Sequence, residues 1–151
     1  MARGHHISVR IVPVILSLLA WPTVALAAGD HAAIPTPDEV PGTIKVDAEG
    51  LIDTLASIPN LIVIDSRISM DRKQGYIEGA ISLPDTETDC DSLQVVLDKP
   101  DTPVLFYCNG PKCGRSVKAI HKAQACGYRV IYWFRGGFEE WTAKGYPFLK
   151  E

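Results

Sequence analysis

The chain has 151 residues, of which 46% are hydrophobic and 22% charged, and its formal net charge is −3. These values are typical of one soluble globular domain; they exclude a fibrous or wholly disordered chain, and the length would crowd two full domains. Mild acidity without a basic cluster argues against nucleic acid or an anionic membrane surface as a partner.

Residues 1–27 have the pattern of a signal peptide. Arg3 and Arg10 supply positive charge, an almost purely apolar run follows, and the run ends in a small-x-small triplet at residues 25–27. An uncleaved membrane anchor is the alternative, but the run contains two prolines and is shorter than a spanning helix requires. We therefore expect cleavage after Ala27, export with a bacterial periplasm as the natural compartment, and no membrane association after cleavage.

The rest of the chain divides into a leader and one folded domain. Residues 28–42 are rich in proline, alanine and acidic residues, which predicts a flexible leader, so the domain is expected over residues 43–151. In chain order, periodicity and caps predict a strand at 43–46, a helix at 48–57, a strand at 61–64, a turn and short strand within 76–82, a brief helix at 92–97, a strand at 103–107, a helix at 115–125, a strand at 129–134 and a last helix at 138–143. This alternation predicts an α/β fold with a mostly parallel central sheet flanked by helices on both faces.

Cys108 stands directly at the carboxyl end of the predicted strand at residues 103–107. Ligands bind at this edge of such sheets. The loop that follows contains two glycines and a proline, so its backbone N–H groups can curl into an anion cradle, and the helix that it opens adds positive potential. Cysteine at the rim of such a cradle has a lowered pKa and is largely a thiolate near neutral pH. The expected site is therefore a nucleophilic Cys108 with the loop residues Asn109, Gly110, Pro111, Lys112, Cys113, Gly114, Arg115 and Ser116. Arg115 is expected to organise the loop, and Lys112 to be a solvated loop tip; attraction of an anionic substrate by their positive charge is the alternative.

Four stretches of sequence, in order and suitably spaced, resemble the rhodanese-like domain family. They are the strand, cysteine, glycine-containing loop and Arg115-Ser116 helix start; Ile64-Asp65-Ser66-Arg67, similar to an Asp-x-Arg strand end; residues 75–81, similar to Gly-His-Ile-x-Gly-Ala with Tyr76 in place of the histidine; and a closing Gly-Tyr, Gly-Gly and Trp pattern over residues 127–141. The resemblance covers residues 43–148 and implies a single rhodanese-like domain.

Sulfur transfer is the activity that this resemblance implies. Cys108 would attack the outer sulfur of a small anionic donor such as thiosulfate, sulfite would leave, and a persulfide would remain on Cys108. Cyanide or a thiol, including a protein thiol, would then collect the sulfur. Asp65 and Arg67 are expected to form a supporting ion pair near the surface, where such pairs contribute little. We expect neither a cofactor nor a metal, because the chemistry requires none and the histidines lack ligating neighbours.

The loop departs from the family pattern in its length. Six residues separate Cys108 from Arg115, where most single-domain members have four, and one of the six is Cys113. Cys113 is therefore either a resolving thiol that attacks a persulfide or a sulfenic acid on Cys108 and leaves a disulfide, or a structural loop thiol or disulfide. The alternatives to a sulfurtransferase are a thiol–disulfide redox protein using both loop cysteines, and a non-catalytic module that binds sulfur or a partner. The pairing of Cys90 stays open, and Cys126 is expected to pack inward as a small apolar residue.

Overall fold

The computed structural model describes Met1 and residues 36–151. The expected signal peptide, after its first residue, and most of the expected leader lie outside the described residues. Residues from Thr36 onward belong to one compact unit. None of the helices in the described part combines the length and the apolar character that crossing a bilayer requires.

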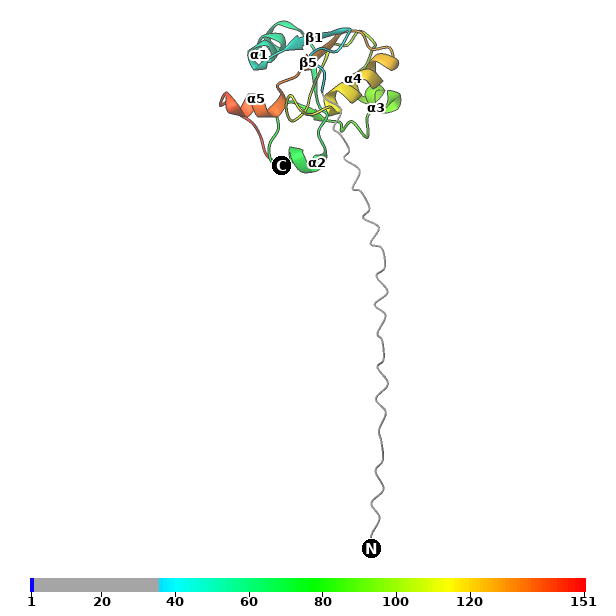
Figure 1. Ribbon diagram of the computed structural model, residues 1–151. Coiled ribbons are helices and arrows are strands. Elements are labelled where there is room, and N and C mark those ends of the chain that lie inside the picture. The colour runs from blue at the N-terminus through cyan, green and yellow to red at the C-terminus, as the bar shows by residue number, and fades with distance from the viewer. Residues whose placement is uncertain (2–35) are drawn as a thin grey trace. The chain divides into compact units, whose positions relative to one another are not determined.

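A five-stranded parallel sheet forms the centre of the described fold (Figure 1). Its strands are β1 (Thr43–Val46), β2 (Ile62–Asp65), β3 (Ile81–Ser82), β4 (Val104–Tyr107) and β5 (Ile131–Phe134). Their order across the sheet is β1-β5-β4-β2-β3, and every neighbouring pair is parallel. The helices are α1 (Ala48–Ser57), α2 (Ser69–Arg72), α3 (Cys90–Val96), α4 (Arg115–Ala125) and α5 (Gly137–Ala143). The α/β fold and the parallel sheet expected from the sequence are confirmed.

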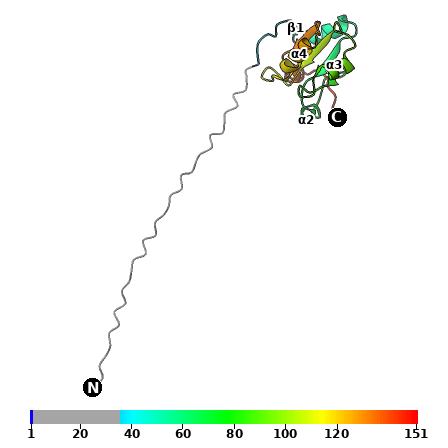
Figure 2. The ribbon, with the colours of Figure 1, turned by 90° about the vertical axis from the view of Figure 1, so that its right-hand side faces the viewer.

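Helices cover both faces of this sheet, and β4 separates two apolar clusters. Phe106 packs with Leu93 of α3 and Ile120 of α4 on one face. Leu105 packs on the other face, in a cluster that includes residues of α1 and α5. All four residues of β4 are completely buried, as a strand covered by helices on both faces must be. Figure 2 shows α3 and α4 side by side against the sheet.

Two parts of the chain differ from the sequence expectations. Helix α2 was not predicted, because one turn of helix over Ser69–Arg72 has too few residues to show a periodicity. The end of the expected leader packs on the domain: Val40 is 4% exposed and belongs to the core, and Arg135 Nε donates to Pro37 O at 3.0 Å. The folded part of the chain therefore includes residues 36–42, upstream of the boundary expected at residue 43.

A disulfide joins Cys90, the first residue of α3, to Cys126 at the end of α4. The expectation that Cys126 is only a small apolar residue was wrong in this respect, although Cys126 does pack against the core. Asp89 caps α3 through a capping box with Ser92, which places Cys90 in the first turn, facing α4. This bond ties the two helices on one face of the sheet together.

We expect the double variant Cys90→Ala, Cys126→Ala to be less stable by about 3 to 4 kcal/mol, because the bond closes a long loop in the unfolded chain. The two cysteines lie 36 residues apart. Urea unfolding of the oxidised protein measures the loss. The double variant Cys108→Ala, Cys113→Ala, which opens a loop of only 5 residues, is the control and should lose roughly 2 kcal/mol. Equal losses in the two double variants would contradict the expectation.

Candidate active site

Cys108 follows β4 at the carboxyl edge of the sheet, and its side chain is 2% exposed. The start of α5 holds the backbone there: Phe138 N donates to Cys108 O at 2.9 Å, and Glu139 N donates to Asn109 O at 2.7 Å. Gly137 makes this approach possible. Its φ of +59° lies in the left-handed region, and a Cβ on it would lie 2.3 Å from Cys108 O. The Gly-Gly-Phe motif of the sequence therefore lets the start of α5 hydrogen-bond to the backbone of the cysteine loop.

The loop turns back on itself and brings its second cysteine to the first. Cys113 N donates to Gly110 O at 2.9 Å across a turn whose tip, Pro111 and Lys112, is exposed. Cys108 and Cys113 form a disulfide, with their Cα atoms 6.1 Å apart. The thiolate expected at Cys108 is therefore absent from this oxidised state, and a nucleophile appears only when the bond is reduced. Sequence reasoning placed both cysteines in one loop but did not decide between a pair and two separate thiols.

Arg115 opens α4 and faces two carboxylates. Its Nη1 donates to Asp71 Oδ2 at 3.1 Å, and its Nε lies 3.6 Å from Asp85 Oδ1. Asn109 Nδ2 donates to the same Asp71 oxygen at 2.9 Å. Asp71 of α2 thus connects the first residue after the cysteine to the first residue of α4. The positive potential expected from Arg115 is largely offset by these acids, and Lys112 points to solvent at the loop tip. Sequence reasoning missed Asp71 and Asp85: Asp85 begins an acidic stretch, whereas nothing in the segment around Asp71 distinguishes that residue.

The first turn of α4 begins directly after the second loop cysteine. Gly114 is the residue before the helix, and no side chain in the described part caps this end. Amide groups of the first helical turn have no partner within the helix, which gives this end a partial positive charge. Ser116 is anchored separately, because its Oγ accepts from Trp133 Nε1 at 3.1 Å. These features suit the amide cradle that the sequence predicts for a negatively charged sulfur.

Asp65 and Arg67 form a buried pair, which corrects the expectation of a surface pair. Their exposed fractions are 0% and 2%, and Arg67 donates to both Asp65 oxygens, at 2.9 and 2.6 Å. Arg67 Nη2 also donates to Gly75 O at 2.7 Å, and Arg72 Nη1 lies 3.6 Å from Asp65 Oδ2.

Tyr107 connects this pair to the cysteine loop. Its hydroxyl donates to Asp65 Oδ2 at 2.8 Å. Burial, and then the negative charge of Asp65, raise the pKa of Tyr107 well above its usual range, so the phenol stays protonated and keeps donating. Tyr107 directly precedes Cys108, so the buried pair fixes the end of β4 rather than touching the sulfur. Sequence reasoning placed Tyr107 at the end of the strand, where it replaces the histidine that precedes the cysteine in related phosphatases, and did not predict its bond to Asp65.

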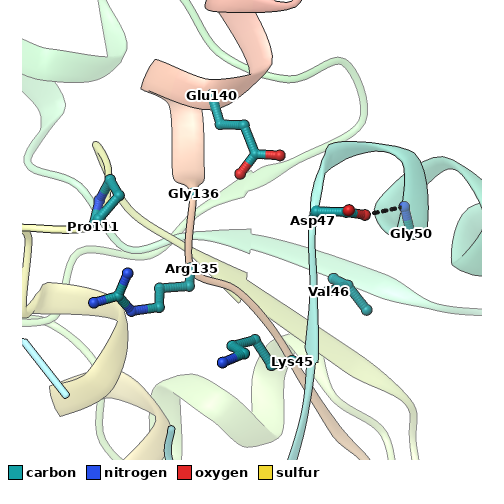
Figure 3. Close-up of a pocket in the computed structure, with 8 residues that line it drawn as sticks. All are labelled: Lys45, Val46, Asp47, Gly50, Pro111, Arg135, Gly136 and Glu140. Carbon is teal, nitrogen blue, oxygen red and sulfur yellow. Dashed lines mark hydrogen bonds between the residues drawn. The ribbon is translucent and has the colours of Figure 1, made fainter. Parts of the chain in front are cut away.

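Two hollows lie beside the loop. One, of about 540 Å³, lies at the carboxyl ends of β1 and β5 next to Pro111, with Arg135 and Glu140 on its wall (Figure 3). Its charged groups already have partners: Arg135 Nη2 lies 3.0 Å from Asp38 Oδ1, and Glu140 Oε1 accepts from Ala48 N at 2.9 Å. A smaller hollow, of about 240 Å³, adjoins Asn109. Cys108 lines neither hollow, so in the oxidised state the sulfur is covered.

The family model of the rhodanese-like domain matches residues 47–144, which is most of the described fold. The chain belongs to the rhodanese-like domain family. A sulfurtransferase of Allochromatium vinosum is 27% identical over 105 residues, covering 70% of this chain and 94% of that protein. An uncharacterised Escherichia coli protein, YibN, is 24% identical over 133 residues, covering 87% of this chain and 88% of that protein.

Solved rhodanese-like structures have the same fold. A Bacillus halodurans protein superposes with a TM-score of 0.62 at 27% identity, covering 72% of this chain and 77% of that one. The rhodanese-like domain of an Anabaena protein gives 0.62 at 22%, covering 71% of this chain and 79% of that one. Family membership and the sulfurtransferase relative support a role in sulfur transfer.

The sequence departs from the family pattern at Tyr76, where that pattern has histidine. The Arg72 guanidinium carbon lies over the Tyr76 ring, 3.7 Å from the ring centroid.

Proposed function

We propose that the chain is a sulfurtransferase that carries sulfane sulfur as a persulfide on Cys108. The observation that carries the proposal is the position of Cys108: buried at the carboxyl end of the central strand, at the start of the loop that opens α4. Family membership supports the same reaction class. In the reduced protein the adjoining amide groups and the start of α4 would favour a thiolate over a thiol.

The reaction has two steps. The Cys108 thiolate bonds to the outer sulfur of a donor such as thiosulfate, the donor's sulfur–sulfur bond breaks, and sulfite leaves with the electron pair. A thiolate or cyanide then bonds to the outer sulfur of the persulfide, and the Cys108 thiolate leaves. Acids beside Arg115 disfavour a doubly charged donor, so small thiol persulfides are donors to test beside thiosulfate.

A thiol–disulfide redox function is the second candidate, and the Cys108–Cys113 disulfide is the observation that favours it. Both functions can share one cycle. The Cys113 thiolate attacks Cys108 Sγ of the persulfide, hydrosulfide leaves with the outer sulfur, and the disulfide forms. A dithiol reductant must then open the disulfide before the next turnover.

We further propose that the mature protein is exported to an oxidising compartment such as the periplasm. The two disulfides support this proposal.

Intact mass spectrometry of the reduced protein separates the two candidates. We expect incubation with thiosulfate, or with a small thiol persulfide, to add the mass of one sulfur atom, and cyanide to remove it with formation of thiocyanate. A pure redox protein would instead lose two hydrogens with a disulfide oxidant and gain no sulfur from any donor. An unchanged mass with every donor and oxidant would contradict both candidates.

A further inference from the structure

The hydroxyl of Ser66 is buried at the end of β2 without a hydrogen-bond partner among the described residues. The residue is completely buried, and its backbone is fully paired: Ser66 N donates to Tyr107 O at 3.0 Å, and Ser66 O accepts from Asp85 N at 3.2 Å. Because an unpaired buried hydroxyl destabilises a fold, native structures rarely keep one without a reason.

The strand register places Ser66 beside Cys108. Asp65 of β2 lies opposite Tyr107 of β4, so the next residues of the two strands are also neighbours, on strands about 4.8 Å apart. The Asp65 and Tyr107 side chains bond to each other and therefore lie on one face of the sheet. Side chains alternate along a strand, so Ser66 and Cys108 both lie on the opposite face. The register therefore places the buried hydroxyl and the buried sulfur at neighbouring positions on the same face of the sheet.

In the oxidised state the Cys108 sulfur is neutral and bonded to Cys113, so it attracts a hydroxyl proton only weakly. Reduction gives this sulfur a negative charge and frees it to rotate about its Cα–Cβ bond. We propose that the Ser66 hydroxyl donates a hydrogen bond to the Cys108 thiolate, and to the same sulfur in the persulfide, in the reduced protein. This inference rests on the proposed function in taking Cys108 as the working thiolate. Such a charge-assisted bond lowers the pKa of the thiol and holds the sulfur in one orientation.

Alkylation of Cys108 by iodoacetamide tests this proposal. The background is Cys113→Ser, which leaves Cys108 without its disulfide partner. We expect Ser66→Ala to slow alkylation by about 3- to 10-fold at a pH below the titration midpoint of the Cys108 thiol. This corresponds to a midpoint, and so a pKa of that thiol, raised by about half to one unit. Absorbance of the thiolate at 240 nm, followed against pH, reports the same midpoint independently.

Ser66→Thr and Ser66→Val form the matched pair, because the two side chains have similar volumes and only threonine keeps the hydroxyl. The threonine variant should keep the low midpoint, and the valine variant should show the raised one. Identical midpoints in the alanine, threonine and valine variants would overturn the proposal. The proposal would also be overturned if Ser66→Ala unfolded at a higher temperature while the titration midpoint of the Cys108 thiol stayed unchanged. The Ser66 hydroxyl would then only destabilise the fold. The titration requires no sulfur donor, so its outcome is independent of whether sulfur transfer is demonstrated.

Discussion

Cys108→Ser is expected to abolish sulfur uptake from thiosulfate or from a small thiol persulfide, whereas Cys113→Ser is expected to retain it. A serine hydroxyl does not ionise near neutral pH, and oxygen cannot form the persulfide in which the carried sulfur is held. Loss of Cys113 removes only the thiol that could displace the outer sulfur, so the persulfide should persist longer than in the wild-type protein. Intact mass after brief exposure to the donor measures both effects.

These two variants are matched controls for each other. Each variant lacks the same disulfide, so the unfolded chain gains the same conformational freedom in both. The free energy of unfolding should therefore fall by a similar amount. Any difference in sulfur uptake therefore reports the chemistry of the two thiols rather than stability. Equal uptake by both variants, or loss of uptake only in Cys113→Ser, would contradict the role assigned to Cys108.

Arg67→Met is expected to lower the free energy of unfolding by about 3 to 5 kcal/mol. The substitution leaves the carboxylate of Asp65 completely buried with two of its hydrogen bonds removed. Arg72, at 3.6 Å, and the Tyr107 hydroxyl still compensate part of the charge, so the lower end of this range is the better expectation. Denaturant unfolding of the oxidised protein measures the change.

Two further variants show whether the buried charge is the cause. Adding Asp65→Asn to Arg67→Met removes the uncompensated charge and should recover part of the lost stability. Arg129→Met breaks the exposed pair with Asp101, in which both side chains are about 70% exposed, and should change stability little. If Arg67→Met behaved like Arg129→Met, the buried pair would not organise the end of β4 as we describe.

The position of Cys108 could be predicted from the sequence because its determinants are local. A short run of apolar residues predicts a strand buried on both faces, and the next residue of such a strand lies at the carboxyl edge of a parallel sheet. The helix that begins at Arg115 follows from its own periodicity and from Gly127 after its end. Together these features place the cysteine loop without any knowledge of distant contacts.

The partners of that loop could not be predicted, because they depend on tertiary contacts. Asp71 lies on a helix too short to have a sequence signature, and nothing local shows that it bonds Asn109 and Arg115. Aspartate and arginine are ordinarily exposed, so the complete burial of Asp65 and Arg67 also lies beyond a local pattern. Four cysteines allow three complete pairings, and spacing alone does not choose among them.

The disulfide at the candidate site makes the proposed activity depend on reduction of the protein. Cys108 is buried and bonded in the oxidised protein, so sulfur uptake should require prior reduction. The bond from Cys90 to Cys126 joins two helices away from the carboxyl edge and has no such role in the proposed cycle. A reductant that opens only the loop disulfide should therefore activate the protein and leave the helix pair connected.

The most direct test uses thiosulfate whose outer sulfur is radioactive. The reduced protein is mixed with this donor, trapped with an alkylating agent and digested, and the labelled peptide is identified. We predict that the label lies on the peptide that contains Cys108, in the wild-type protein and more abundantly in Cys113→Ser. Label attached only to Cys113 would contradict the proposal that Cys108 carries the transferred sulfur. The absence of protein-bound label, both from this donor and from a small thiol persulfide with a radioactive outer sulfur, would contradict it too, provided that the Cys108 thiol is free.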